Sequence, residues 1–290
     1  MGEKLCFLCA MKRAFWVSAL GGFIAIVFLT STGCTTTETG RKQLNFVSVE
    51  QETQLGLTAF EQMKKEVPIS TDSKAKSLVE RVGAKIAEQA KGRMPDAKWE
   101  FVVFESKEAN AFCLPGGKIG VYTGLLPITQ NEAGLATVIG HEVAHASNHH
   151  GAERMSTATA LQGVTQAGGA VAGEKYSQIT MVALGGLGKV GVELPFSRKQ
   201  ESEADEVGLN YMARAGYDPE EAVRFWERFS ASHQGQSQGF ELLRTHPVDA
   251  QRIADLKRLM PEAKAEFRKA KAGGAAAESP GGKGATIISK

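Results

Sequence analysis

The sequence has few cysteines, at positions 6, 9, 34 and 113 of 290 residues. Removal of an N-terminal signal would leave only Cys34 and Cys113, and the first of these is predicted to carry lipid, so an intramolecular disulfide framework is excluded. Basic and acidic residues nearly balance at a net charge of +2, and no basic stripe indicates nucleic-acid binding. The apolar run at 14–29 is too short to favour a membrane-spanning helix.

The amino terminus has the charged, apolar and small-residue order of a signal peptide. A Lys-Arg pair precedes the apolar run, and Ser-Thr-Gly-Cys at 31–34 resembles a bacterial lipoprotein cleavage site, with Ser where Leu is usual. We therefore expect a signal peptide at 1–33, with Met11 as an alternative start, and lipidation of Cys34. Thr35 follows in place of the Asp that resembles an inner-membrane retention signal. The predicted location is the periplasmic face of the bacterial cell envelope, with a lipid anchor in the outer membrane.

The sequence His-Glu-Val-Ala-His at 141–145 carries most of the chemical information. On a helix, positions i and i+4 share a face, so His141 and His145 can present ring nitrogens to one zinc ion, with Glu142 placed to act as a general base. The alternative is an amphipathic helix with two core histidines and a surface glutamate. The apolar run at 134–140 favours a metal site, because buried imidazoles need partners. A capping box at 129–132 is predicted to start this helix.

A catalytic zinc site needs a third protein ligand. The metzincin pattern is excluded, because Asn148 and Gly151 stand where it requires Gly and His. Glu-Ser-Glu-Ala-Asp in a later predicted helix supplies Glu201 as the ligand, and Asp205 shares its face as a carboxylate that would orient a ligand histidine. Glu203 is the competing ligand, and a solvated acidic helix face is the alternative for the whole cluster.

These two motifs, together with Asn-Ala-Phe-Cys-Leu-Pro-Gly-Gly at 110–117 and Thr-His-Pro at 245–247, resemble the zinc metallopeptidases related to HtpX and the type-two CAAX prenyl proteases. The periplasmic, membrane-attached bacterial branch is the most similar, and the resemblance covers about 41–259. It implies a gluzincin that hydrolyses peptide bonds with one Zn²⁺ per chain, held by the three ligands named above.

The resemblance also assigns a role to His246. It matches a family histidine that can approach the metal, where an imidazole could stabilise the oxyanion or occupy the open metal position. A plain loop histidine is the alternative. Arg252, further along, is expected either to bind a carboxylate or phosphate-like charge or to form a salt bridge on a helix surface.

A small sheet is predicted before the metal-binding helix. Residues 98–104 and 118–123 have strand composition, and the turn-rich 115–117 can form a hairpin. An exposed edge strand beside the metal would bind a peptide by adding it to the sheet. An ordinary buried hairpin is the alternative. The substrate-binding candidates are Asn110, Ala111 and Phe112.

The predicted fold class is α+β: a mainly helical, zincin-type metallopeptidase domain with a small antiparallel sheet whose edge strand flanks the zinc cleft. Helical patterns run from 49 to 66 and from 73 to 90. The region 151–192 is either a mobile lid or a pair of core helices. The predicted parts are the signal peptide at 1–33, a lipidated tether at 34–48, the metallopeptidase domain at 49–260, and a low-complexity, disordered tail at 261–290.

The sequence therefore predicts a membrane-anchored zinc endopeptidase that acts on misfolded or membrane-associated proteins in the bacterial periplasm, as part of protein quality control. Its expected partners are unfolded envelope proteins and, through the lipid anchor, a membrane. The alternative is a lipid-anchored chaperone or assembly factor for outer-membrane proteins, with a structural or latent zinc site. A structural site is usually closed by four protein ligands, so His246 as a stable fourth ligand would favour that alternative.

Overall fold

The computed structural model describes residues 34–167, 197–231, 242, 245–246 and 250–278. The first two long helices form where the sequence predicts them, as α2 (Val49–Glu66) and α3 (Ser73–Ala90). Ser48 starts α2 with a capping box, and the Asp72 carboxylate accepts hydrogen bonds from two backbone amides at the start of α3. One face of α3 is apolar and packs into the core, which explains why its pattern was readable from the sequence.

A three-stranded sheet follows, made of β3 (Glu100–Phe104), β4 (Ala111–Leu114) and β5 (Lys118–Tyr122) in the order β3-β5-β4. The predicted hairpin is confirmed, because β4 and β5 pair antiparallel. The sheet is mixed, however, and not antiparallel throughout: β5 lies between the other two strands and pairs parallel with β3. Residues 105–110 lead from β3 to β4, which lies on the far side of β5. The hairpin then places β5 between β4 and β3, where β5 runs in the same direction as β3.

Helices cover both faces of the sheet. On one face α2 packs through an aromatic cluster of Phe60, Phe104, Phe112 and Tyr122, with ring centroids 5.8 to 6.5 Å apart in mostly edge-to-face pairs. On the other face α3 and α5 (Glu132–Ser147) enclose the main core. The edge strand β4 packs on α5, so the sheet positions the helix that carries the His-Glu-Val-Ala-His sequence.

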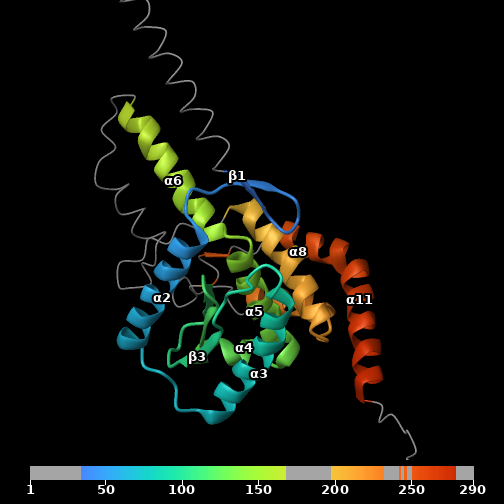
Figure 1. The fold of residues 1–290 in the computed structure, drawn as a ribbon. Coiled ribbons are helices and arrows are strands. Elements are labelled where there is room, and N and C mark those ends of the chain that lie inside the picture. The colour runs from blue at the N-terminus through green and yellow to red at the C-terminus, as the bar shows by residue number, and fades with distance from the viewer. Residues whose placement is uncertain (1–33, 168–196, 232–241, 243–244, 247–249, 279–290) are drawn as a thin grey trace, which may run out of the picture.

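The start of α5 differs in detail from the prediction. After η1 (Thr123–Leu125) and α4 (Leu126–Thr129), the N-cap of α5 is Asn131, whose side chain accepts a hydrogen bond from the Gly134 amide. Thr129 is the last residue of α4 and therefore does not cap α5. The next helix, α6 (His150–Ala167), follows almost directly, and Figure 1 shows it projecting away from the sheet.

Three further helices complete the described body: α8 (Arg198–Arg214), α9 (Glu220–Ala231) and α11 (Ala250–Glu278). The predicted capping box of Ser197 and Gln200 starts α8. The backbones of α5 and α8 touch: a Cβ atom on Gly208 would lie 2.8 Å from the carbonyl carbon of Gly140. Glycine at both positions permits this approach, which brings Glu201 close to the histidines of α5.

The segment predicted to be a tether is folded. Its strands β1 (Cys34–Thr36) and β2 (Lys42–Leu44) form a short antiparallel hairpin that lies beside α6 and α8 in Figure 1. The tail also differs from the prediction, because α11 continues to Glu278 and buries Ala263. Alanine and lysine favour a helix, and Figure 1 shows α11 running alongside α8.

Some predictions fall outside the described residues, namely the signal peptide at 1–33, most of the predicted lid, and the end of the tail after 278. Within the part of the chain that the structure describes, no helix is both long enough and apolar enough to cross a membrane.

Candidate metal centre

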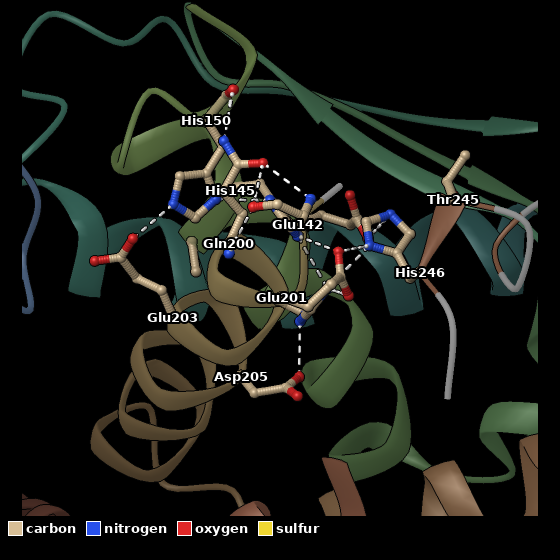
Figure 2. A network of polar contacts seen from close by, with 12 residues as sticks. Glu142, His145, His150, Gln200, Glu201, Glu203, Asp205, Thr245 and His246 are labelled. Atoms are coloured by element: carbon tan, nitrogen blue, oxygen red, sulfur yellow. Dashed lines mark hydrogen bonds and ion pairs between the residues drawn. The ribbon is translucent and has the colours of Figure 1, made fainter. Parts of the chain in front are cut away.

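Four buried side chains converge at the C-terminal half of α5: His141, His145, Glu201 and His246, whose ligand atoms all lie within 4.8 Å of one another. The Nε2 atom of His141 is 3.1 Å from Nε2 of His145 and 3.2 Å from Nδ1 of His246. The Glu201 carboxylate approaches all three rings, at 2.8 to 3.4 Å. Figure 2 shows Glu201 and His246 pointing toward one another in this cluster.

The cluster fits a zinc ion in its spacing and its donor atoms. Tetrahedral zinc with bonds of about 2.0–2.2 Å holds its ligand atoms roughly 3.3–3.6 Å apart, which is close to the observed separations. Three imidazole nitrogens and one carboxylate oxygen are donors that zinc accepts in proteins. Among the described residues, Glu142 Oε1 is a buried side-chain oxygen without a hydrogen-bond partner.

The charge of the cluster also fits a divalent cation. The buried carboxylates of Glu142, Glu201 and Asp205 surround one buried guanidinium, that of Arg252. With these four groups ionised and the histidines neutral, as metal ligands must be, two negative charges are left unbalanced in a region of low dielectric, and a Zn²⁺ ion would neutralise them.

Asp205 lies where the sequence predicted it, behind His141. Its Oδ1 atom is 3.0 Å from His141 Nδ1, on the side of the ring opposite the cluster. Arg252 donates to both oxygens of Asp205 at 2.7 and 2.8 Å and lies 3.1 Å from Glu201 Oε2. Its guanidinium stacks over the Trp226 ring at 3.9 Å. Arg252 therefore binds carboxylates of its own chain inside the core and is not part of a surface salt bridge.

The His145 ring is hydrogen-bonded to other residues, whose role could not be seen in the sequence analysis. Its Nδ1 atom lies 2.8 Å from Nδ1 of His150, and His150 Nε2 donates to the Glu203 carboxylate at 3.0 Å. Figure 2 shows Glu203 turned away from Glu201 and toward His150, so Glu203 is not a metal ligand in this structure. The position of His150 depends on a chain reversal after α5, where His149 adopts φ 55°.

The two glutamates closest to the histidines have opposite pKa shifts. Burial raises the pKa of Glu142, whose Oε1 atom lies 3.5 Å from His246 Nε2. Burial alone would also raise the pKa of Glu201, but His246, His141 and His145 outweigh it and hold that pKa far below its ordinary range. Glu201 is therefore permanently charged, whereas Glu142 is able to exchange a proton.

The pKa values of His145 in the cluster and of Glu203 behind it are also shifted. Burial lowers the pKa of His145 well below its ordinary value, which keeps the ring neutral. Burial would raise the pKa of Glu203, but hydrogen bonds from His150, Thr37, Thr39 and Arg41 outweigh it and hold this pKa at about 2. Glu203 is thus an anion throughout the neutral range.

The predicted substrate strand contributes mainly to the core. Phe112 belongs to the aromatic cluster under α2, while Ala111 and Asn110 are also buried. A peptide added at β4 would therefore contact the backbone of this strand, which is at the edge of the three-stranded sheet. Burial and the nearby Glu142 carboxylate raise the pKa of the Cys113 thiol, which keeps it protonated. Cys34 is exposed at the start of β1, and its lipidation stays a prediction.

The helical domain and its His-Glu-Val-Ala-His helix define a zincin-type metallopeptidase. Residues 73–260 match the sequence profile of peptidase family M48, and the chain belongs to that family. The predicted class of enzyme, a zinc metallopeptidase, is thereby confirmed at the level of the family.

Individual relatives come from mitochondria and from bacteria. The mitochondrial metalloendopeptidase OMA1 of Schizosaccharomyces pombe is 34% identical over 226 residues, which are 77% of this chain and 65% of that protein. OMA1 of Arabidopsis thaliana is 38% identical over 192 residues, 64% of this chain and 37% of the relative. The beta-barrel assembly-enhancing protease of Escherichia coli K12 is 27% identical over 241 residues, 81% of this chain and 49% of the relative. The chain thus spans less than two thirds of the length of these relatives.

The predicted location in a bacterial outer membrane is contradicted by these matches. Relatives with 34, 36 and 38% identity are named as mitochondrial enzymes, whereas the bacterial relative reported above has lower identity. The assignment to the periplasmic lipoprotein branch is likewise not confirmed. Mitochondrial and bacterial relatives each match most of this chain, so the motifs that carried the resemblance carry no information on location.

Proposed function

We propose that this chain is a zinc-dependent endopeptidase that hydrolyses peptide bonds in unfolded or misfolded polypeptides. The single observation that carries the proposal is the convergence of His141, His145 and Glu201 on one point, with Glu142 beside it. These three residues would hold the zinc ion. When bound, zinc would polarise the scissile carbonyl and increase the acidity of water.

The residues of the chain would then perform the proton transfers. Glu142, whose pKa is raised by burial, takes a proton from the attacking water as the oxygen forms its bond to the carbonyl carbon. As the C–N bond breaks, Glu142 returns this proton to the departing amine. The imidazole of His246 lies on the same side of the cluster as Glu142 and is a candidate donor to the oxyanion.

A broad substrate range is consistent with the position of β4. This edge strand packs on α5 and could pair with an extended peptide through backbone hydrogen bonds, which place little demand on sequence. Because a folded protein does not offer a free extended segment, unfolded and misfolded chains are the proposed substrates. These unfolded and misfolded chains are also the proposed partners.

His246 supports a second candidate function. Its Nδ1 atom is 3.2 Å from His141 Nε2 and 2.8 Å from Glu201 Oε1, so it could close the site as a fourth ligand. A closed four-ligand site is typical of structural zinc. The second candidate is therefore a client-holding chaperone or assembly factor, in which zinc stabilises the fold or keeps the enzyme latent.

One experiment separates these functions: zinc content and cleavage of casein are measured together for the wild type, Glu142→Gln and His246→Ala. We expect one zinc per chain in the wild type and in Glu142→Gln, with cleavage lost in the latter, because an amide accepts no proton from water. A gain of cleavage in His246→Ala would show that His246 is an inhibitory ligand. Substantial cleavage by a zinc-loaded Glu142→Gln protein would contradict the assignment of the base, and zinc without cleavage in every form would favour the chaperone.

A further inference from the structure

The turn between β1 and β2, residues 37–41, binds one buried carboxylate with three side chains. The hydroxyls of Thr37 and Thr39 donate to Glu203 Oε1, and Arg41 Nε donates to Glu203 Oε2 at 2.7 Å. The turn is tight because Gly40 adopts φ 87° and its amide donates to the Thr37 carbonyl at 3.1 Å. Glu203 is 5% exposed, so this anion depends on protein groups and not on solvent for its hydrogen bonds.

Further hydrogen bonds fix the hairpin on the C-terminal end of α5. The Glu38 amide donates to the Asn148 side chain at 2.7 Å, and the Gln43 side chain donates to the Asn148 carbonyl at 2.9 Å. The Tyr211 hydroxyl donates to the Glu38 carboxylate at 2.6 Å. Asn148 is the C-cap of the helix that carries His145, so the turn is attached next to a metal ligand.

The hydrogen bonds behind His145 run in one direction. A histidine that binds a metal through Nε2 carries its hydrogen on Nδ1. His145 would therefore donate to His150 Nδ1, 2.8 Å away, and His150 donates through Nε2 to Glu203. No other arrangement of hydrogens satisfies both contacts while leaving His145 Nε2 free for a metal.

We propose that the 37–41 turn positions a metal ligand: it holds Glu203, Glu203 holds His150, and His150 keeps the His145 ring oriented toward the metal. The inference rests on the proposed function, because it requires that His145 bind zinc. Arg41 is suited to this role because it is held from both sides, with Glu153 accepting two further hydrogen bonds at 2.6 and 2.8 Å. Groups of this kind behind a metal ligand typically change metal affinity by 10- to 100-fold.

The test measures metal retention in the full chain. Zinc-loaded protein is mixed with excess chromophoric chelator, and the rate of zinc loss is recorded. The visible absorption bands of Co²⁺-substituted protein report the geometry of the ligands. We expect Glu203→Gln to lose zinc about 10- to 100-fold faster than the wild type and Arg41→Gln to lose it several-fold faster, each with altered cobalt bands. The control is Arg81→Gln, which removes an exposed ion pair to Glu132 of 2.7 Å and should retain zinc like the wild type.

A double variant separates positioning from general damage to the structure. If Arg41 acts through Glu203, adding Arg41→Gln to Glu203→Gln causes little further loss, whereas independent structural effects would add. Thermal unfolding in chelator identifies a variant that does not fold. In that case Thr39→Val, which removes one hydroxyl that donates to Glu203, is measured in place of the unfolded variant. Zinc loss at the wild-type rate in both single variants, or full additivity in the double variant, would overturn the inference. A wild type that binds no metal would refute the proposed function itself.

Discussion

Among the described residues, Arg252 is the one buried arginine or lysine that faces the carboxylates of the metal centre, and replacing it tests how far it balances their charge. It is 6% exposed and contacts both oxygens of Asp205 as well as Glu201. Arg252→Gln removes the guanidinium partner of two buried carboxylates. Breaking a buried ion pair by removing one member typically costs about 3–5 kcal/mol, because the remaining charge stays in a region of low dielectric.

A loss of this size would be large compared with the total stability of a domain, which is about 5–15 kcal/mol. For a chain of this length it corresponds to a decrease in melting temperature of roughly 6–20 °C. The assay is urea unfolding with excess chelator, followed by circular dichroism, so that bound zinc does not compensate the Glu201 charge. We expect a lower midpoint with an unchanged m-value.

The matched control is Arg214→Gln. Arg214 pairs with Glu266 at 3.2 Å on the surface of α8, where its side chain is 42% exposed. Exposed pairs contribute about 0–1 kcal/mol, so this variant should unfold close to the wild-type midpoint. A loss of less than about 1 kcal/mol in Arg252→Gln, similar to the control, would refute the reasoning, because the desolvation of Arg252 would then offset its attraction to the carboxylates.

Two further predictions concern the helix contact and the protonation of the centre. Gly208→Ala should lower the free energy of unfolding by about 1–3 kcal/mol and weaken zinc binding, because the new methyl group overlaps the backbone at Gly140; unchanged unfolding and zinc titration would contradict the observed contact. Burial and Arg252 would lower the pKa of His141 in the metal-free protein, but Asp205 and Glu201 outweigh them and raise it to about 9 from an ordinary 6.5. The protonated His141 ring therefore stabilises the metal-free fold, fully below about pH 6.5, and this contribution is lost as the pH rises through 9. Zinc binding should displace this proton, so zinc should bind more tightly as the pH rises to about 9. Calorimetry in two buffers of different ionisation enthalpy measures the proton, and zinc binding with no proton release at pH 7.5 would contradict the shift.

The parts of the fold that could be predicted from the sequence are those that short-range patterns determine. Helices α2 and α3 have a clear apolar face and strong N-caps, and the β4–β5 hairpin has its turn in the sequence. The parallel pairing of β3 with β5 could not be inferred in this way, because it depends on which strand the hairpin meets after folding. The short strands β1 and β2 had no apolar alternation, since they are held mainly by polar contacts to distant residues.

The residues of the candidate site likewise divide into those whose positions follow from local sequence patterns and those whose positions depend on tertiary contacts. His141, Glu142 and His145 share one helix, and Glu201 and Asp205 share another, so their relative positions follow from helical geometry. The roles of His150 and Glu203 depend on the chain reversal at His149, whose side chain is hydrogen-bonded to Glu52, and on the docking of the β1–β2 turn. His150 lies only five residues after His145, and this second histidine near the motif was the one signal that could have pointed to it.

The contact between Gly140 and Gly208 also bears on how the protein exchanges its metal. Because the backbones of α5 and α8 touch there, the two histidines and Glu201 belong to one rigid pair of helices whose spacing is set when the chain folds. An arriving ion would find its ligands already assembled and would not need to organise the chain. Loading and removal of the ion can then proceed without unfolding, so protein stripped by a chelator should regain its metal on simple addition of zinc.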